Sequence, residues 1–268
     1  MDSLSAVVFP TDCSLCGQEL TEARGLSACR NCWDSLQPWA GPACARCGLP
    51  FASPHALDSS ASLCAECREG EFEFDLARSY GLYTGHLRSL ILQLKFRRRE
   101  RLGRRLGELL APVWESIQDH ADPLLVPVPL HPSRKRERGF NQAELLAQGL
   151  VTKLRRAGRK PELQVETDCL CRIRATVPQT GLSIAARREN VRGVFGVDKP
   201  ETPRDRVVVL IDDVMTTGAT LSACARALKH AGAARVLALT LARATPQFPD
   251  FDSASSRLPV DEAGRDSA

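Results

Sequence analysis

The stretch that decides the fold of this 268-residue chain spans residues 207–220 and reads Val207-Val208-Val209-Leu210-Ile211-Asp212-Asp213-Val214-Met215-Thr216-Thr217-Gly218-Ala219-Thr220. Its apolar first part predicts a buried strand over residues 206–211, which delivers two carboxylates at its carboxyl end. A turn that is rich in hydroxyls follows, and a helix is expected over residues 219–231. Open α/β sheets bind their ligands at this place, beyond the carboxyl ends of the strands.

The turn predicts a site for a phosphate group, because backbone N–H groups and the first turn of a helix would meet a phosphate dianion there. The residues assigned to this ligand site are Val214, Met215, Thr216, Thr217, Gly218, Ala219 and Thr220. Asp212 and Asp213 would accept hydrogen bonds from vicinal hydroxyls of an attached sugar. One alternative is a purely structural turn. Another is the metal-binding strand of a P-loop ATPase, but the sequence lacks the G-x-x-x-x-G-K-[ST] loop that this requires.

Beyond residue 75 the chain alternates apolar runs with amphipathic stretches, as expected of a sheet covered by helices. Further strands are predicted over residues 77–83, 124–128 and 235–241. Helical spacing of apolar residues predicts helices over residues 87–94, 102–117 and 142–154. Strands that alternate with helices favour a mainly parallel sheet, so the predicted fold class is α/β.

Eight of the 11 cysteines form four Cys-x-x-Cys pairs near the start of the chain: Cys13 with Cys16, Cys29 with Cys32, Cys44 with Cys47, and Cys64 with Cys67. Four such pairs favour a metal over disulfides or redox pairs, and four thiolates suit Zn²⁺. Gly17 and Gly48 each follow the second cysteine of a pair, which indicates one unit over residues 13–32 and another over residues 44–67. A crossed pairing of the four knuckles is the alternative.

Two closed Zn(Cys)₄ sites predict a structural role, because so short a segment cannot bury enough apolar surface to fold without metal. A docking surface for nucleic acid or for protein is the functional alternative. Residues 1–75 hold 4 Lys and Arg against 11 Asp and Glu, and this acidity favours a protein partner over nucleic acid.

Charge and composition divide the chain into three predicted parts: a double zinc ribbon over residues 1–75, the α/β domain over residues 76–244 and a disordered tail over residues 245–268. The middle part holds 30 Lys and Arg against 16 Asp and Glu, a net charge of +14. Such a balance suits a polyanionic ligand, either a pyrophosphate compound or a nucleic acid. A solvated basic surface is the alternative.

The first residues carry Asp2 and only a short apolar run, so no secretory peptide is predicted. No window of the sequence has the apolar length that a membrane span needs. The predicted location is therefore the cytoplasm, where thiols stay reduced.

The stretch 207–220 resembles the phosphoribosyl-pyrophosphate (PRPP) loop of type I phosphoribosyltransferases, through its acid pair and its Thr-Thr-Gly-x-Thr turn. Three further segments resemble one branch of that superfamily, the ComF family of competence proteins. They are Tyr83-Thr84-Gly85 with Lys95-Phe96-Arg97; Val126-Pro127-Val128-Pro129-Leu130 followed by Arg138-Gly139-Phe140-Asn141-Gln142; and Gln179-x-x-Leu182 with Arg187 or Arg188, Asn190 and Phe195. With the cysteine pairs, the resemblance covers nearly everything up to about Ala244.

The resemblance implies a fold that binds PRPP together with Mg²⁺. Loops at the positions of Lys95, Arg97 and Arg138 face the pyrophosphate in that superfamily, and charge-assisted contacts to such a group are strong. Arg138 belongs to a basic cluster, residues 134–138, that is expected on a loop after the second core strand. Residues 175–192 resemble the mobile loop that closes over substrate, and the ligand-binding residues assigned there are Gln179, Arg188 and Asn190.

Proteins of the ComF family are associated with DNA uptake in natural transformation and are reported to handle incoming single-stranded DNA. The first interpretation is therefore a ComF-like protein that binds PRPP with Mg²⁺ and meets single-stranded DNA or a DNA-processing partner. One alternative is a working phosphoribosyltransferase of nucleotide metabolism, and another is a non-catalytic regulator that senses PRPP. No segment resembles a hood that would read a particular base, so the sequence does not identify an acceptor.

Overall fold

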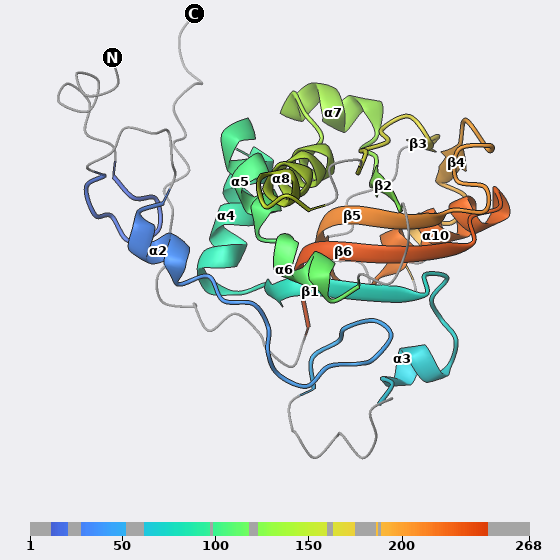
Figure 1. Cartoon of the computed structure of the whole chain (residues 1–268), viewed down its shortest axis with the longest axis horizontal. Coiled ribbons are helices and arrows are strands. Elements are labelled where there is room, and N and C mark those ends of the chain that lie inside the picture. Colours follow the sequence, from blue (N-terminus) through green and yellow to red (C-terminus); the bar gives the residue numbers. More distant parts are fainter. Residues whose placement is uncertain are drawn as a thin grey trace, which may run out of the picture.

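The computed structural model describes residues 12–20, 28–51, 62–96, 99–117, 123–159, 163–174, 186 and 189–245. At its centre lies a four-stranded sheet in the order β1-β6-β5-β2, in which every neighbouring pair is parallel (Figure 1). The strands are β1 (Leu76–Leu82), β2 (Leu124–Pro127), β5 (Val207–Met215) and β6 (Arg235–Arg243). The predicted α/β class with a mainly parallel sheet is confirmed.

The apolar run of β5 is buried on both faces of the sheet. Val209 and Ile211 belong to one hydrophobic core, and Val208 and Leu210 belong to a second core. Successive side chains of a strand point to opposite faces, so a strand that is covered on both sides needs an unbroken apolar run. This explains why residues 207–211 show no polar alternation.

Helices cover both faces of the sheet. The first core joins it to α4 (Gly85–Phe96), α5 (Glu100–Glu108), α6 (Ala111–Glu115) and α8 (Gln142–Arg156), and the second core joins it to α10 (Ala219–His230). The single helix predicted over residues 102–117 is wrong, because the helix ends after α5 and a new helix, α6, begins at Ala111. Pro112 stands in the first turn of α6, where a proline needs no N–H partner, and it could not continue a helix from α5.

Three short elements complete the domain. Strands β3 (Leu170–Arg172) and β4 (Phe195–Val197) form an antiparallel pair, and β4 lies against α10. The basic cluster at residues 134–138, expected on a loop, lies on a helix, α7 (Pro132–Arg138). Local signals explain this helix, since Pro132 occupies its first turn, the His131 side chain accepts a hydrogen bond from the Ser133 N–H, and Gly139 ends it with φ of 84°.

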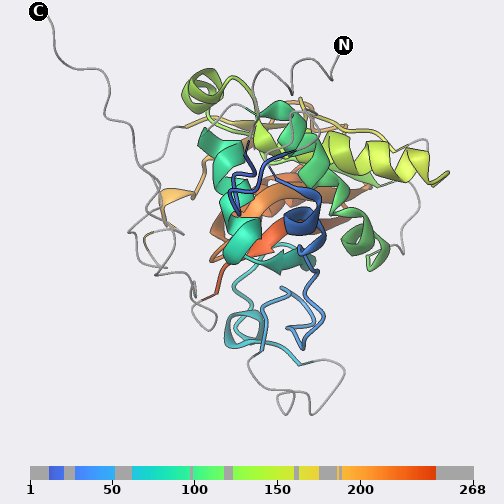
Figure 2. The same ribbon diagram turned by 90° about the vertical axis from the view of Figure 1, so that its left-hand side faces the viewer.

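The two cysteine units pack on different parts of the domain. Cys13, Cys32 and the segment around α2 (Arg30–Asp34) join the first core, and the Arg105 guanidinium of α5 lies 4.0 Å from the Trp33 ring centroid. The second unit, which includes α3 (Ala65–Arg68), joins the second core. Figure 1 shows α2 beside α4, whereas α3 lies below β1, as it also does in Figure 2. Within the described part of the chain, no helix has both the length and the apolar character to cross a membrane.

Candidate functional site

The acid pair lies inside β5, two residues before the strand ends. The Asp213 side chain is buried, and its Oδ1 lies 3.0 Å from Nζ of Lys95, in the last turn of α4. Asp213 Oδ2 is buried and has no hydrogen-bond partner among the described residues. Burial without a partner costs free energy, so this oxygen is placed to bind a donor or a cation.

Asp212 sits in a position that disfavours its charge. Burial and, to a lesser extent, the neighbouring charge of Asp213 raise the pKa of Asp212 to about 7, and the charges of Lys95 and Arg172 act in the opposite direction. Its Oδ1 accepts a hydrogen bond of 2.8 Å from the Asp213 N–H. Two carboxylates held this close attract positive charge, either a cation or ligand hydroxyl protons.

The predicted phosphate loop connects β5 to α10. Gly218 adopts φ of 75° and directly precedes α10, which begins at Ala219. A Cβ atom at Gly218 would lie 2.8 Å from the Phe72 ring, so both the backbone conformation and the packing require glycine there. The Ala219 N–H donates to Thr217 Oγ1 at 3.4 Å, so two of the predicted ligand donors contact each other in this structure.

Arg138 faces the acid pair from the last turn of α7. Burial lowers the pKa of Arg138, while the charges of Asp213 and, less strongly, Asp212 raise it. Its Nη1 donates to Gln142 Oε1 at 3.0 Å, which fixes the guanidinium against the start of α8. The structure therefore brings Lys95 and Arg138 to the acid pair, with Arg138 on a helix and not on a loop, and their contact with a ligand stays a prediction.

Two arginines near the site were missed by sequence reasoning. Arg172 of β3 contributes positive charge to the surroundings of Asp212, and its guanidinium lies 5.6 Å from the Phe195 ring centroid. Arg243 is the last residue of β6 and is 5% exposed, and its Nη1 donates to the carbonyl oxygens of Met215 at 3.3 Å and of Thr216. The available signal for Arg243 was a charge at the carboxyl end of a strand that has no other charged residue from Val236 to Ala242.

Three of the predicted ligand residues, Arg97, Gln179 and Arg188, lie outside the described residues. Asn190 is described and directly precedes Val191, whose side chain is buried. A contact between Asn190 and the ligand stays a prediction. The described site therefore rests on the acid pair, the loop and the basic side chains that surround them.

Each cysteine unit gathers its four sulfur atoms. The Sγ atoms of the first cluster (Cys13, Cys16, Cys29 and Cys32) lie within 4.8 Å of one another, and so do those of the second cluster (Cys44, Cys47, Cys64 and Cys67). A tetrahedral ion with Zn–S bonds of about 2.3 Å needs sulfurs about 3.8 Å apart. The separations of 3.7 Å for Cys16 and Cys29 and of 3.5 Å for Cys47 and Cys64 fit such an ion. The predicted pairing is confirmed, and the crossed arrangement is wrong.

Backbone N–H donors lower the pKa of one thiol in each cluster. Burial opposes ionisation of Cys13, but N–H groups led by that of Cys29, at 3.2 Å from its Sγ, lower the pKa to about 6. In the second cluster, hydrogen bonding with the Cys47 side chain outweighs burial, and N–H groups including that of Cys64, at 3.3 Å, also lower the pKa of Cys44, to about 4. Thiolates are the form that binds metal, so both clusters suit Zn²⁺.

Comparison with known proteins places both parts of the chain. Residues 4–68 match the family described as double zinc ribbon domain, and residues 139–262 match the family described as phosphoribosyl transferase domain. Competence protein F of Haemophilus influenzae is 32% identical over 224 residues, which cover 81% of this chain and 90% of that protein. DNA utilization protein YhgH of Escherichia coli K12 is 33% identical over 75% of this chain and 83% of that protein. Competence protein ComFC of Bacillus subtilis is 28% identical over 80% of this chain and 83% of that protein.

Proposed function

Because the chain belongs to the ComF family of competence proteins, with a double zinc ribbon and a phosphoribosyl transferase domain, we propose that it binds PRPP with Mg²⁺ and takes part in DNA uptake. The observation that carries the proposal is the acid pair of β5, held beside Lys95 and Arg138 and followed directly by the glycine-containing loop. The proposed role requires binding of PRPP and not its transfer to an acceptor.

The loop and the acid pair would bind different groups of the ligand. The N–H groups of the loop and of the first turn of α10 would bind the 5′-phosphate, since a helix amino terminus favours negative charge. The carboxylates of Asp212 and Asp213 would accept hydrogen bonds from ribose hydroxyls. The positive charges of Lys95, Arg138 and Arg172 surround the acids and would stabilise the pyrophosphate.

The residues present fit a divalent cation. Asp213 Oδ2 is a buried carboxylate oxygen without a partner among the described residues, and carboxylate oxygens are the ligands that Mg²⁺ prefers. Bound Mg²⁺ would supply positive charge to the pyrophosphate oxygens. Asp213 and Asp212 would then hold the ligand and cation together, while Lys95 Nζ pairs with Asp213 Oδ1.

The DNA role is supported by charge and by the names of the relatives. Two relatives are named competence proteins and one a DNA utilization protein. On α7, Lys135 and Arg136 are exposed, and Arg138 of the same helix faces the acid pair. We therefore assign contacts with single-stranded DNA, or with a DNA-processing partner, to α7. The proposed location is the cytoplasm, where the eight cluster thiols would stay reduced.

PRPP with Mg²⁺ is expected to raise the melting temperature of the zinc-loaded protein by several degrees. A ligand at about 100 times its Kd stabilises the native state by about 2.7 kcal/mol, provided that it does not bind the unfolded chain. Differential scanning fluorimetry measures the shift, and Mg²⁺ alone is the control. An equal shift with inorganic pyrophosphate and with PRPP would show that the ribose and the loop contribute nothing.

Single-stranded DNA is expected to bind with an affinity that falls steeply with salt. For Z phosphate contacts, the slope of log affinity against log salt should be close to −0.7Z. Arg136→Ala should make this slope shallower by about 0.7. Arg235→Ala is the matched control. Arg235 is exposed and is the first residue of β6, so it lies at the amino ends of the parallel strands, whereas the acid pair lies near their carboxyl ends. Fluorescence anisotropy measures both, and a slope near zero for the unmodified chain would rule out direct DNA binding.

A further inference from the structure

The second cysteine cluster lies close to the phosphate loop and shares a buried arginine with it. Arg243 donates to the Met215 and Thr216 carbonyls, as described above, and these residues begin the loop. Burial lowers the pKa of Arg243, whereas the negative charges of Cys47, Cys64, Glu66 and Cys67 raise it. One buried cation therefore donates hydrogen bonds to the loop and interacts electrostatically with three cysteines of the second cluster.

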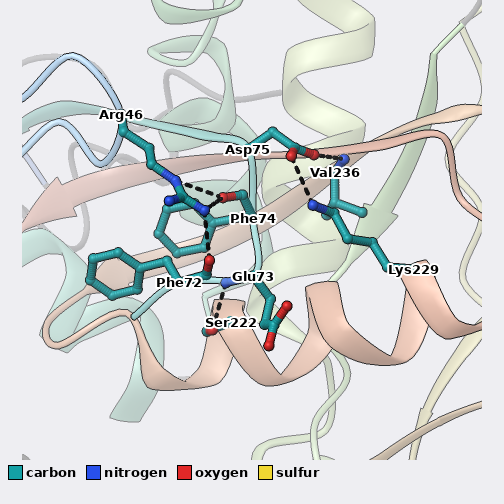
Figure 3. Close-up of polar contacts among 8 residues, drawn as sticks. All are labelled: Arg46, Phe72, Glu73, Phe74, Asp75, Ser222, Lys229 and Val236. Carbon is teal, nitrogen blue, oxygen red and sulfur yellow. Dashed lines mark hydrogen bonds and ion pairs between the residues drawn. The ribbon is translucent and has the colours of Figure 1, made fainter. Parts of the chain in front are cut away.

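A second connection passes through residues 72–75, which we call the strap. Arg46 lies between Cys44 and Cys47, and its guanidinium donates to the carbonyl oxygens of Phe72 at 2.6 Å and of Phe74 at 3.0 Å (Figure 3). The Phe72 ring in turn packs against the loop, with an atom 2.8 Å from where a Cβ atom of Gly218 would be. The knuckle that holds the cluster thus fixes the side chain on which the loop rests.

The strap is also fastened to α10. The Glu73 N–H donates to Ser222 Oγ at 3.0 Å (Figure 3). Asp75 accepts hydrogen bonds from Lys229 Nζ at 2.7 Å and from the Val236 N–H at 2.8 Å. α10 begins at the loop and β6 ends at Arg243, so the strap connects the cluster to the two elements that border the phosphate site.

The first cluster differs in this respect. Cys16 is exposed and Cys29 is half-buried, whereas all four cysteines of the second cluster are buried. The first cluster packs into the core that contains α4, α5 and α8, while Phe72 belongs to the second core. Only for the second cluster does the described part of the chain show contacts that reach the phosphate loop.

We propose that Arg243 and the strap are positioning elements through which the metal state of the second cysteine cluster sets the geometry of the phosphate loop. An intact Zn(Cys)₄ centre carries two net negative charges, which hold the Arg243 guanidinium, and its knuckle holds Arg46 against Phe72. Loss of zinc removes both restraints. The loop then loses the support under Gly218 and the donor to its carbonyls, and it binds phosphate more weakly.

Thermodynamic reciprocity gives this coupling a measurable form. If zinc at the second cluster favours the ligand-binding loop, a bound ligand must favour retention of that zinc by the same factor. The inference rests on the proposed binding of PRPP, but the coupling between cluster and loop is also visible without ligand. A merely structural role for Arg243 predicts lower stability and no change in zinc release on ligand binding.

The test uses the full-length zinc-loaded protein and follows zinc release to a chromophoric chelator, with and without saturating PRPP and Mg²⁺. Because Cys16 is exposed and all four cysteines of the second cluster are buried, we expect a fast phase from the first cluster and a slow phase from the second. We expect PRPP to retard the slow phase at least threefold and to leave the fast phase unchanged. Arg243→Met should abolish the retardation, and Arg243→Lys should restore part of it.

Arg78→Met is the matched control. Its guanidinium donates to the Ala45 carbonyl at 2.8 Å and also faces the thiolates of Cys44 and Cys47, yet its hydrogen bonds go to the knuckle and to β1 and not to the loop. This variant should speed zinc release and keep the PRPP effect. Arg46→Met cuts the strap route while leaving Arg243 in place, and it should weaken the PRPP effect if Arg243→Met fails to fold.

Two outcomes overturn the inference, and they are distinguishable from failure of the proposed function. If calorimetry shows PRPP binding but the slow phase does not respond, the coupling is absent. If PRPP does not bind at all, the proposed function fails, and amide hydrogen exchange over residues 214–220 decides the coupling. Zinc-loaded Arg243→Met should then exchange there at least tenfold faster than Arg78→Met, and equal rates refute the coupling.

Discussion

Asp213→Asn is expected to lower the affinity for PRPP with Mg²⁺ at least a hundredfold. The change removes the charge of a buried carboxylate. Its Oδ2 has no partner among the described residues and is therefore placed to bind a cation or a ligand group. It also removes the partner of Lys95 at 3.0 Å. Isothermal calorimetry measures the loss, and circular dichroism checks that secondary structure is retained.

Stability must be separated from binding in this variant, because breaking a buried ion pair destabilises a protein by up to about 3–5 kcal/mol. The Lys95 side chain is 20% exposed, so the cost of Asp213→Asn should fall below that range. The double variant Lys95→Met with Asp213→Asn should recover stability and still fail to bind. Recovery of binding in the double variant would show that the unpaired charge of Lys95, and not the loss of the Asp213 carboxylate, weakens binding in the single variant.

Asp212→Asn should also abolish tight binding, but with the opposite effect on stability. The pKa of Asp212 is raised in the folded state, to about 7, so the native state holds this proton more tightly than the unfolded chain does. Ionisation of Asp212 therefore destabilises the fold progressively as the pH rises from about 4 through about 7, and Asn removes that cost. The variant should melt higher than the unmodified protein at pH 8, with a smaller difference at pH 5.

Cys47→Ser is expected to destabilise the protein far more than Cys16→Ser does. Cys47 is 1% exposed and shares a core with Phe72 and Phe74, whereas Cys16 is exposed. Loss of the second zinc leaves thiols in that core without their ion, so we expect a cost of at least ~3 kcal/mol and a fall in melting temperature of about 10 °C. Cys16→Ser should cost about 1 kcal/mol or less.

Elemental analysis accompanies this comparison. The unmodified chain should contain two zinc ions, and each variant should contain one. Equal losses of stability in the two variants would show that the clusters are equivalent and that burial of the second has no energetic consequence. One ion in the unmodified chain would contradict the assignment of both clusters to zinc.

The sequence predicted the parallel sheet and the cysteine pairs because both depend on local pattern. An unbroken apolar run marks a strand buried on both faces, and Cys-x-x-Cys spacing places two sulfurs on one knuckle. The predicted end of β5 at residue 211 was wrong, since the strand continues to Met215 because it pairs with β6. Asp212, Val214 and Met215 lie in register with Thr240, Ala242 and Arg243, and local sequence holds no record of that pairing.

The other differences concern α7, Arg243 and the strap. The basic run of residues 134–138 was expected on a ligand-facing loop, although Pro132 and Gly139 are typical helix boundaries. The roles of Arg243 and of the strap could not be predicted, because both depend on tertiary contacts between distant segments, such as Arg243 with Met215 and Glu73 with Ser222. Sequence pattern identifies the ligand loop, but only the tertiary structure shows what supports it.

Titration calorimetry of the purified, zinc-loaded protein with PRPP, in the presence and absence of Mg²⁺, tests the central claim most directly. We expect saturable binding at one site per chain that requires Mg²⁺ and that Asp213→Asn abolishes. Absence of binding with Mg²⁺, in a sample that contains two zinc ions and melts cooperatively, would contradict the account and would leave the loop as a structural element of the fold.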